Sequence, residues 1–181
     1  SGDGEDIDHA DGDGDGDEHE GDHSHDGEDP HFFTDPTRMA AAARGILEEV
    51  VEVVPALGSA EVRADAELYI SELEDLDVEV EGILEVVAAE DRVLVTNHEV
   101  FGYFADRYGF ELVGAVIPGG GTSSGASAGV MAELAKVIER EGVRAVFTDT
   151  SSSADLARTL AGEVDGVEVV ELYSESLGEA G

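Results

Sequence analysis

The chain has 181 residues, of which 44 are acidic and 9 are basic, and its formal net charge is −35. A chain this negative repels phosphate backbones and anionic lipid surfaces, which argues against a nucleic acid partner. The lack of cysteine excludes disulfides, thiolate metal ligands and cysteine nucleophiles. No apolar run reaches the roughly 18 residues that a membrane-spanning helix needs. The length fits one ordinary domain, or one domain with a tail.

The first 29 residues differ in composition from the rest. They hold 14 of the 44 acidic residues, four of the six histidines and neither lysine nor arginine. Their only aliphatic side chain larger than alanine is Ile7, which leaves too little apolar surface to support a fold. We therefore expect residues 1–29 to form a flexible acidic loop, rich in histidine and glycine. The rest of the chain is also acidic, with Lys136 as its single lysine, a pattern typical of halophile proteins.

Two helices are predicted after this loop. Asp35 and Pro36 mark a helix start, because an N-cap residue is followed by proline at the first helical position. The apolar spacing continues this helix to residue 54, and Pro55 ends it. A longer helix is predicted from Ala60, where apolar residues recur at alternating spacings of four and three. These residues are Val62, Ala66, Tyr69, Leu73, Leu76, Val80, Ile83 and Val87.

The apolar pattern that begins at Ala60 implies a helix of about 28 residues and roughly 42 Å, which is long for a small domain. It fits either a coiled-coil strand or a spine helix that joins two lobes. The spine helix is favoured, because an α/β pattern follows it instead of further heptads. The chain then divides into the acidic loop at 1–29, a helical segment at 30–58, the spine at 59–90 and an α/β lobe at 91–181.

Strands and helices alternate in this second lobe. We expect strands at 92–96, 112–117, 145–148 and 167–172, and helices at 99–108, 126–141 and 153–163. Strands separated by helices form βαβ units, so the fold class is α/β, with a mostly parallel four-stranded sheet after the long spine helix. Ligands of such sheets bind at the carboxyl ends of the strands.

Two of these strand ends carry candidate metal ligands. His98 follows the first strand and Glu175 follows the fourth, so both belong to the same edge of the predicted sheet. Outside the acidic loop the only other histidine is His31, which comes just before the first helix. Two imidazoles and a carboxylate suit a borderline divalent ion such as Zn²⁺.

Three segments of the chain carry a family resemblance. Residues 29–36 read DPHFFTDP, residues 65–77 form the centre of the long helix, and residues 95–109 read VTNHEVFGYFADRYG. They resemble the DPHxWxDP segment, the spine helix and the VTxHxAFxYFxxRYG segment of the metal-binding lipoproteins of zinc and manganese ABC importers. The segments occur in the order of that family, and the acidic stretch before them resembles its mobile loop.

The resemblance implies roles for individual residues. The family's second and third ligand histidines correspond to His31 and His98, and its carboxylate ligand corresponds to Glu175, where the family normally has aspartate. A histidine at the third position implies Zn²⁺ as the bound cargo, with Mn²⁺ as the second choice. The family's first ligand histidine lies upstream of the acidic loop, and a final helix follows the carboxylate. This chain is therefore expected to be a fragment, or a truncated copy, that lacks most of the first lobe and keeps its closing helix at 30–58, with the second lobe at 91–181.

The implied function is capture of Zn²⁺ outside the cell and delivery to the membrane permease of an ABC importer. We expect a monomeric binding protein without enzymatic activity, lipid-anchored at the extracellular face of the cell membrane. Two alternatives remain open: a zinc-dependent hydrolase that uses the same three ligands, and a passive metal buffer. Histidine prefers zinc to calcium or magnesium, so the acidic loop is predicted to hold weak auxiliary zinc sites, unless its histidines are incidental to a solvated, salt-adapted loop. The histidines concerned are His9, His19, His23 and His25.

Overall fold

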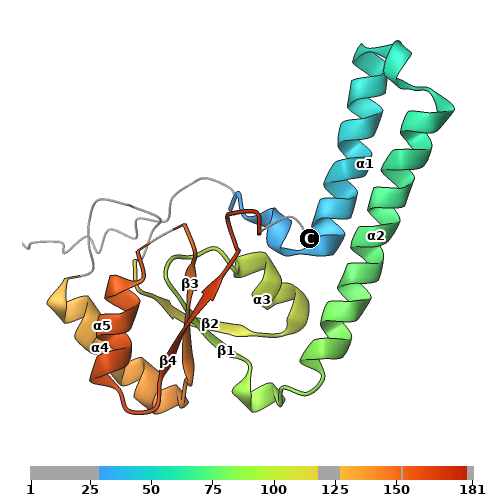
Figure 1. Cartoon of the computed structure of the whole chain (residues 1–181). Coiled ribbons are helices and arrows are strands. Elements are labelled where there is room, and N and C mark those ends of the chain that lie inside the picture. Colours follow the sequence, from blue (N-terminus) through green and yellow to red (C-terminus); the bar gives the residue numbers. More distant parts are fainter. Residues whose placement is uncertain (1–28, 118–126, 152, 179–181) are drawn as a thin grey trace, which may run out of the picture.

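The computed structural model describes residues 29–117, 127–151 and 153–178. A long hairpin of two helices, α1 (Pro36–Val53) and α2 (Ala60–Leu84), precedes an α/β lobe (Figure 1). No helix among these residues is both long and apolar enough to span a membrane. The predicted auxiliary zinc sites lie outside the described residues; they are those at His9, His19, His23 and His25.

The limits of α1 follow from its local sequence. Oδ1 of Asp35 accepts hydrogen bonds from the N–H groups of Thr37 (2.8 Å) and Arg38 (3.3 Å), which a helix start otherwise leaves unpaired. Pro36 occupies the first helical position, where no N–H is needed. The helix ends at Val53, and Pro55 begins a short 3-10 helix, η2 (Pro55–Leu57). The predicted first helix is confirmed.

The long second helix is also present, but it turns a different face to its neighbours than the apolar spacing predicts. Its buried residues are Ile70 and Asp77, whereas Tyr69 and Leu76 of the predicted stripe are 46% and 44% exposed. The buried face includes alternate members of the predicted stripe. Between them it contains the residues that directly follow the other members: Ile70 after Tyr69, and Asp77 after Leu76. The half-buried members of this face are Ala66, Leu73, Val80 and Leu84.

The spine helix ends at Leu84, three residues earlier than expected, because Arg92 binds the carbonyls that follow. Its guanidinium donates to the carbonyl oxygens of Leu84 (3.0 Å), Val87 (3.1 Å) and Tyr108 (2.7 Å). These bonds satisfy acceptors that a helix end leaves free, and they direct the chain into the sheet through η3 (Ala89–Asp91).

The second lobe is a four-stranded sheet in the order β2-β1-β3-β4, and all three strand pairings are parallel. Its core lies between the sheet and the helices α4 and α5, which lie together on one side of it (Figure 1). The fold class predicted from the alternation is therefore confirmed. The strands are β1 (Val93–Thr96), β2 (Glu111–Ala115), β3 (Ala145–Asp149) and β4 (Glu168–Leu172), and the helices are α3 (Gly102–Tyr108), α4 (Ala128–Glu141) and α5 (Asp155–Glu163).

A shared carboxylate joins the spine helix to the second lobe. Oδ1 of Asp77 accepts from Nε of Arg107 (2.9 Å) and from the hydroxyl of Tyr108 (2.9 Å), and Arg107 also pairs with its second oxygen. The hydrogen bond from Arg107 holds the pKa of the Asp77 carboxyl below its ordinary value, although burial opposes this shift. Burial and the bond to Asp77 raise the pKa of the Tyr108 hydroxyl. These contacts connect α2 with α3, the helix that follows the His98 turn.

Candidate metal centre

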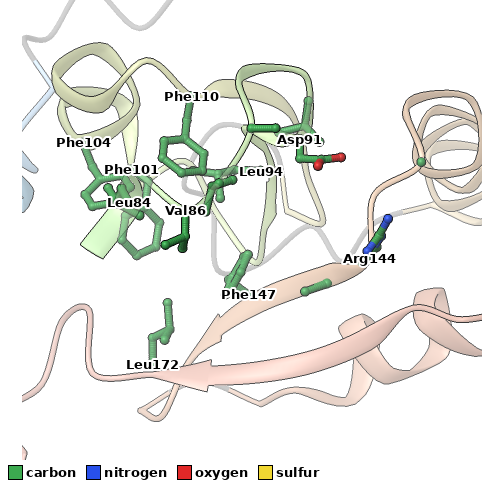
Figure 2. A pocket seen from close by; sticks show the side chains of 15 residues that line it. Leu84, Val86, Asp91, Leu94, Phe101, Phe104, Phe110, Arg144, Phe147 and Leu172 are labelled. Carbon is green, nitrogen blue, oxygen red and sulfur yellow. The ribbon is translucent and has the colours of Figure 1, made fainter. Parts of the chain in front are cut away.

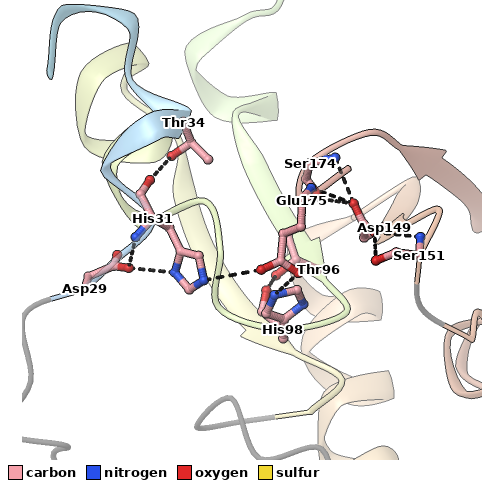
Figure 3. Close-up of polar contacts among 9 residues, drawn as sticks. All are labelled: Asp29, His31, Thr34, Thr96, His98, Asp149, Ser151, Ser174 and Glu175. Atoms are coloured by element: carbon pink, nitrogen blue, oxygen red, sulfur yellow. Dashed lines mark hydrogen bonds and ion pairs between the residues drawn. The ribbon is translucent and has the colours of Figure 1, made fainter. Parts of the chain in front are cut away.

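The structure brings the three predicted ligands together. His31, His98 and Glu175 each offer one ligand atom, and these atoms all lie within 4.8 Å of one another. Nε2 of His98 lies 3.0 Å from Oε2 of Glu175, and Nε2 of His31 lies 3.7 Å from Oε1 of the same carboxylate (Figure 3). The two imidazoles are less than a fifth exposed and the glutamate is about a third exposed, so the site is shielded yet open to solvent on one side.

His31 is held by the residue two positions before it. Oδ1 of Asp29 lies 2.7 Å from Nδ1 of His31 and also accepts from the His31 backbone N–H at 3.0 Å. An ionised carboxylate only accepts, so Nδ1 carries the proton and the lone pair of Nε2 is directed at the site. The Tyr103 hydroxyl donates to the Asp29 carbonyl at 3.2 Å, which connects this segment to α3. The short 3-10 helix η1 (Phe32–Thr34) then leads into α1.

His98 lies in a tight turn between β1 and α3. The Thr96 hydroxyl donates to the His98 carbonyl at 2.8 Å, and the Val100 N–H donates to it at 2.9 Å. The Asn97 N–H donates to the Phe147 carbonyl of β3 at 2.8 Å, which fixes the turn to the sheet. The helix predicted from residue 99 therefore starts only at Gly102, because the preceding residues form the turn that presents His98.

Glu175 lies in the loop after β4, and this loop is bound to Asp149 at the end of β3. Oδ2 of Asp149 accepts from the N–H and hydroxyl of Ser174 and from the N–H of Glu175, each at 2.8 Å. Oδ1 accepts from the Ser151 N–H at 2.6 Å and from its hydroxyl. Burial raises the pKa of Asp149, but the bonds from Ser151, Glu175 and Ser174 outweigh it and hold the pKa well below its ordinary value.

Asp29 and Asp149 hold the segments that carry His31 and Glu175, and no role is predicted for either from the sequence. Asp29 was visible as part of the DPHFFTDP segment, two residues before a candidate ligand. The sequence indicates a role for Asp149 less clearly. It shows only an acidic residue at a predicted strand end, followed by residues with hydroxyl groups. Neither pattern shows that the carboxylate contacts a ligand-bearing segment, because that contact depends on how the strands pair.

The donor set and spacing suit a tetrahedral zinc ion. Zinc binds imidazole nitrogen and carboxylate oxygen at about 2.0–2.2 Å, so two tetrahedral ligand atoms lie about 3.3–3.6 Å apart. The two distances from the Glu175 oxygens to the imidazole nitrogens, 3.0 and 3.7 Å, bracket this range. Together with the mutual separation of less than 4.8 Å, these distances fit three side chains that bind one ion.

An apolar pocket of about 640 Å³ lies elsewhere in the lobe and contains none of these ligands (Figure 2). Phe101 and Phe104 contribute from the start of α3, and Phe147 and Leu172 from β3 and β4. The pocket lining is aliphatic and aromatic, apart from a few groups such as Asp91 and Arg144, and so lacks the ligand chemistry of a metal site.

The chain is similar in sequence to proteins that are named for zinc uptake, zinc binding or manganese binding. The model of the ZnuA family, described as zinc-uptake complex component A periplasmic, matches residues 3–181. The zinc-binding protein TroA of Treponema pallidum is 33% identical over 158 residues, which cover 84% of this chain and 50% of TroA. The manganese-binding lipoprotein MntA of Halalkalibacterium halodurans is 26% identical over 158 residues, which cover 86% of this chain and 51% of MntA.

The fold agrees with these sequence matches. A solved structure of the periplasmic zinc-binding protein TroA from Treponema pallidum superposes with a TM-score of 0.74 and 31% sequence identity. The superposition covers 84% of this chain and 56% of that one. The chain thus spans about half the length of the TroA and MntA relatives that it matches.

Proposed function

Because the chain belongs to the family of periplasmic zinc-uptake component A proteins, we propose that it captures Zn²⁺ outside the cell and delivers it to the membrane permease of an ABC importer. The observation that carries this proposal is the convergence of His31, His98 and Glu175 on one point. The name of TroA as a zinc-binding protein supports zinc as the cargo.

The ligand chemistry favours zinc over manganese. Two imidazole nitrogens and one carboxylate oxygen form a borderline-soft set, whereas Mn²⁺ is better served by a larger share of oxygen ligands. Mn²⁺ remains the second choice, since the relative MntA is named for manganese.

The proposed activity is binding without turnover. The two carboxylates nearest the candidate ligands have positioning contacts: Asp29 orients His31, and Asp149 binds the loop that carries Glu175. The contacts of Asp77 with Arg107 and Tyr108 hold the spine helix on the second lobe, so release of the ion would come from local movement of the ligand segments. These points favour a receptor over the hydrolase alternative.

The acidic loop would assist this capture. His9, His19, His23 and His25 lie among 14 carboxylates in the first 29 residues, and such a segment attracts cations. We propose that it binds more than one zinc ion weakly, because fixing the backbone of each residue that a site orders costs about 1–2 kcal/mol. Its role would be to raise the metal concentration near the tight site.

The place of action would be the extracellular face of the cell membrane, where a monomeric receptor meets its permease. The relative MntA is named a lipoprotein, which supports a lipid anchor in the whole protein.

The proposed function is tested by calorimetric titration of the 181-residue chain with Zn²⁺ and, separately, with Mn²⁺. We expect one tight zinc site that Glu175→Gln weakens strongly and that the matched exposed control Glu111→Gln leaves unchanged. Weak sites that disappear when the four loop histidines are changed to glutamine, with the tight site intact, would support the auxiliary role. A tight site that survives Glu175→Gln, or zinc-dependent hydrolysis of esters or peptides by the chain, would contradict the proposal.

A further inference from the structure

We propose that Asp149 is a positioning residue for metal capture: its buried carboxylate fixes the loop after β4 so that Glu175 faces the two histidines. The inference rests on the proposed function, because it takes Glu175 to be a metal ligand. Asp149 acts through the backbone of the segment that carries Glu175, whose N–H and that of Ser174 donate to it (Figure 3).

The pairing of β3 with β4 places Asp149 beside the start of this loop. Asp149 is opposite Leu172 in the parallel ladder, and the Thr150 N–H donates to the Leu172 carbonyl at 2.9 Å. Only Tyr173 separates the end of β4 from Ser174 and Glu175, whose N–H groups both donate to Oδ2 of Asp149. The loop therefore turns around the Asp149 carboxylate directly after leaving the sheet.

Hydrogen bonds, and no cation, balance the charge of this carboxylate. Asp149 is 2% exposed, and the ion pairs found among the described residues do not include it. A buried carboxylate is tolerated only when donors satisfy its oxygens. Three of its five donors belong to the ligand loop, so a conformation that moves Ser174 and Glu175 away would leave a buried charge partly unsatisfied.

This constraint matters for Glu175 because a glutamate side chain has several rotatable bonds. With its N–H held at 2.8 Å from Asp149, the side chain starts from a fixed point and reaches Nε2 of His98 at 3.0 Å. Partners outside the ligand shell that orient a ligand typically contribute 10- to 100-fold to metal affinity. We expect a contribution of that size from Asp149.

Asparagine cannot replace Asp149, although it has the same shape. Oδ1 accepts the backbone N–H of Ser151, and Oδ2 accepts those of Ser174 and Glu175. Either orientation of an asparagine amide would place its NH₂ group against at least one backbone N–H, donor against donor. Asp149→Asn should therefore release one of the two loops while leaving the side-chain volume unchanged.

The test is a double-mutant cycle on the 181-residue chain, with Zn²⁺ affinity measured for wild type, Asp149→Asn, Glu175→Ala and the double variant. If Asp149 acts through Glu175, Asp149→Asn weakens zinc binding about 10- to 100-fold when Glu175 is present and has little effect after Glu175→Ala. An equal loss in both backgrounds would overturn the inference, because general destabilisation does not depend on Glu175.

Two further measurements separate positioning from folding. Ser174→Ala removes a hydroxyl donor on the ligand loop and Ser151→Ala removes one on the opposite loop, so the larger loss of affinity is expected for Ser174→Ala. The visible absorption spectrum of bound Co²⁺ should shift in Asp149→Asn towards that of Glu175→Ala, which reports loss of the carboxylate ligand. An unchanged Co²⁺ spectrum would overturn the inference. Wild type that fails to bind zinc would instead refute the proposed function, on which the inference depends.

Discussion

Nε2 of His98 lies 3.0 Å from Oε2 of Glu175, although one residue follows β1 and the other follows β4. The two strands do not pair with each other; β3 lies between them in the sheet. Because all pairings are parallel, the carboxyl ends of the strands meet at one edge, and the turns that leave them converge. The contact between these two candidate ligands therefore depends on the sheet as a whole.

His98→Ala should weaken zinc binding by more than the 10- to 100-fold that loss of an outer partner typically costs, because a coordinate bond is lost. Calorimetric titration of the chain measures this. Glu99→Ala is the matched control, since it removes an exposed acidic side chain from the same turn. Equal affinities for His98→Ala and Glu99→Ala would place the tight site elsewhere.

Asp29→Ala should weaken zinc binding about 10- to 100-fold, because His31 loses the carboxylate that orients its ring and fixes its tautomer. Asp29→Asn keeps an acceptor at Oδ1 and should give a smaller loss. Tyr103→Phe serves as the control, since it removes the bond to the Asp29 backbone and leaves the Asp29 side chain in place. A loss from Tyr103→Phe as large as that from Asp29→Ala would show that anchoring of the segment, and not the carboxylate, determines affinity.

Asp77→Asn should lower the free energy of unfolding by about 1–3 kcal/mol at pH 7, because the negative charge that pairs with Arg107 and the acceptor at Oδ2 are lost. The pKa of Asp77 is lower in the folded chain than its ordinary value of about 3.9. Its stabilisation is therefore complete above that value and is lost as the pH falls through the lower, folded-state pKa.

Urea unfolding at several pH values measures this difference. The gap between wild type and Asp77→Asn should shrink below about pH 4, where the carboxyl of the unfolded chain begins to gain its proton, and should close as the pH falls through the lower, folded-state pKa. Asp75→Asn, at an exposed position in the same helix, controls for the general acid sensitivity of a chain with 44 carboxylates. A gap that stays constant with pH would show that Asp77 does not act through its charge.

Two isoleucines in the spine helix test which of its faces is packed. Ile70 is 1% exposed and Ile83 is 61% exposed. Ile70→Ala should cost about 2–5 kcal/mol of unfolding free energy, and Ile83→Ala should stay within about 0.5 kcal/mol. Urea unfolding of the two variants measures the difference, and the opposite ranking would mean that the predicted apolar stripe is the packed face after all.

Local chemistry was readable from the chain alone. Asp35, Pro36 and Pro55 limit the first helix, because capping and the missing proline N–H act over only a few residues. Gly109 and Gly142 end α3 and α4 in left-handed conformations that glycine adopts without strain. The alternation of strands and helices predicted the parallel sheet. Because the carboxyl ends of parallel strands share one edge, this prediction also placed His98 and Glu175 at the same edge of the sheet.

Only the tertiary structure shows which of these residues are in contact and which hydrogen bonds keep them in place. The apolar spacing of the spine helix could not show that Asp77 is buried, since its burial depends on Arg107 and Tyr108 from another helix. The role of Asp149 likewise depends on the pairing of β3 with β4 and on donors from the loop that follows. A carboxylate can be buried only where donors from distant parts of the chain converge on it, and that convergence is a property of the fold.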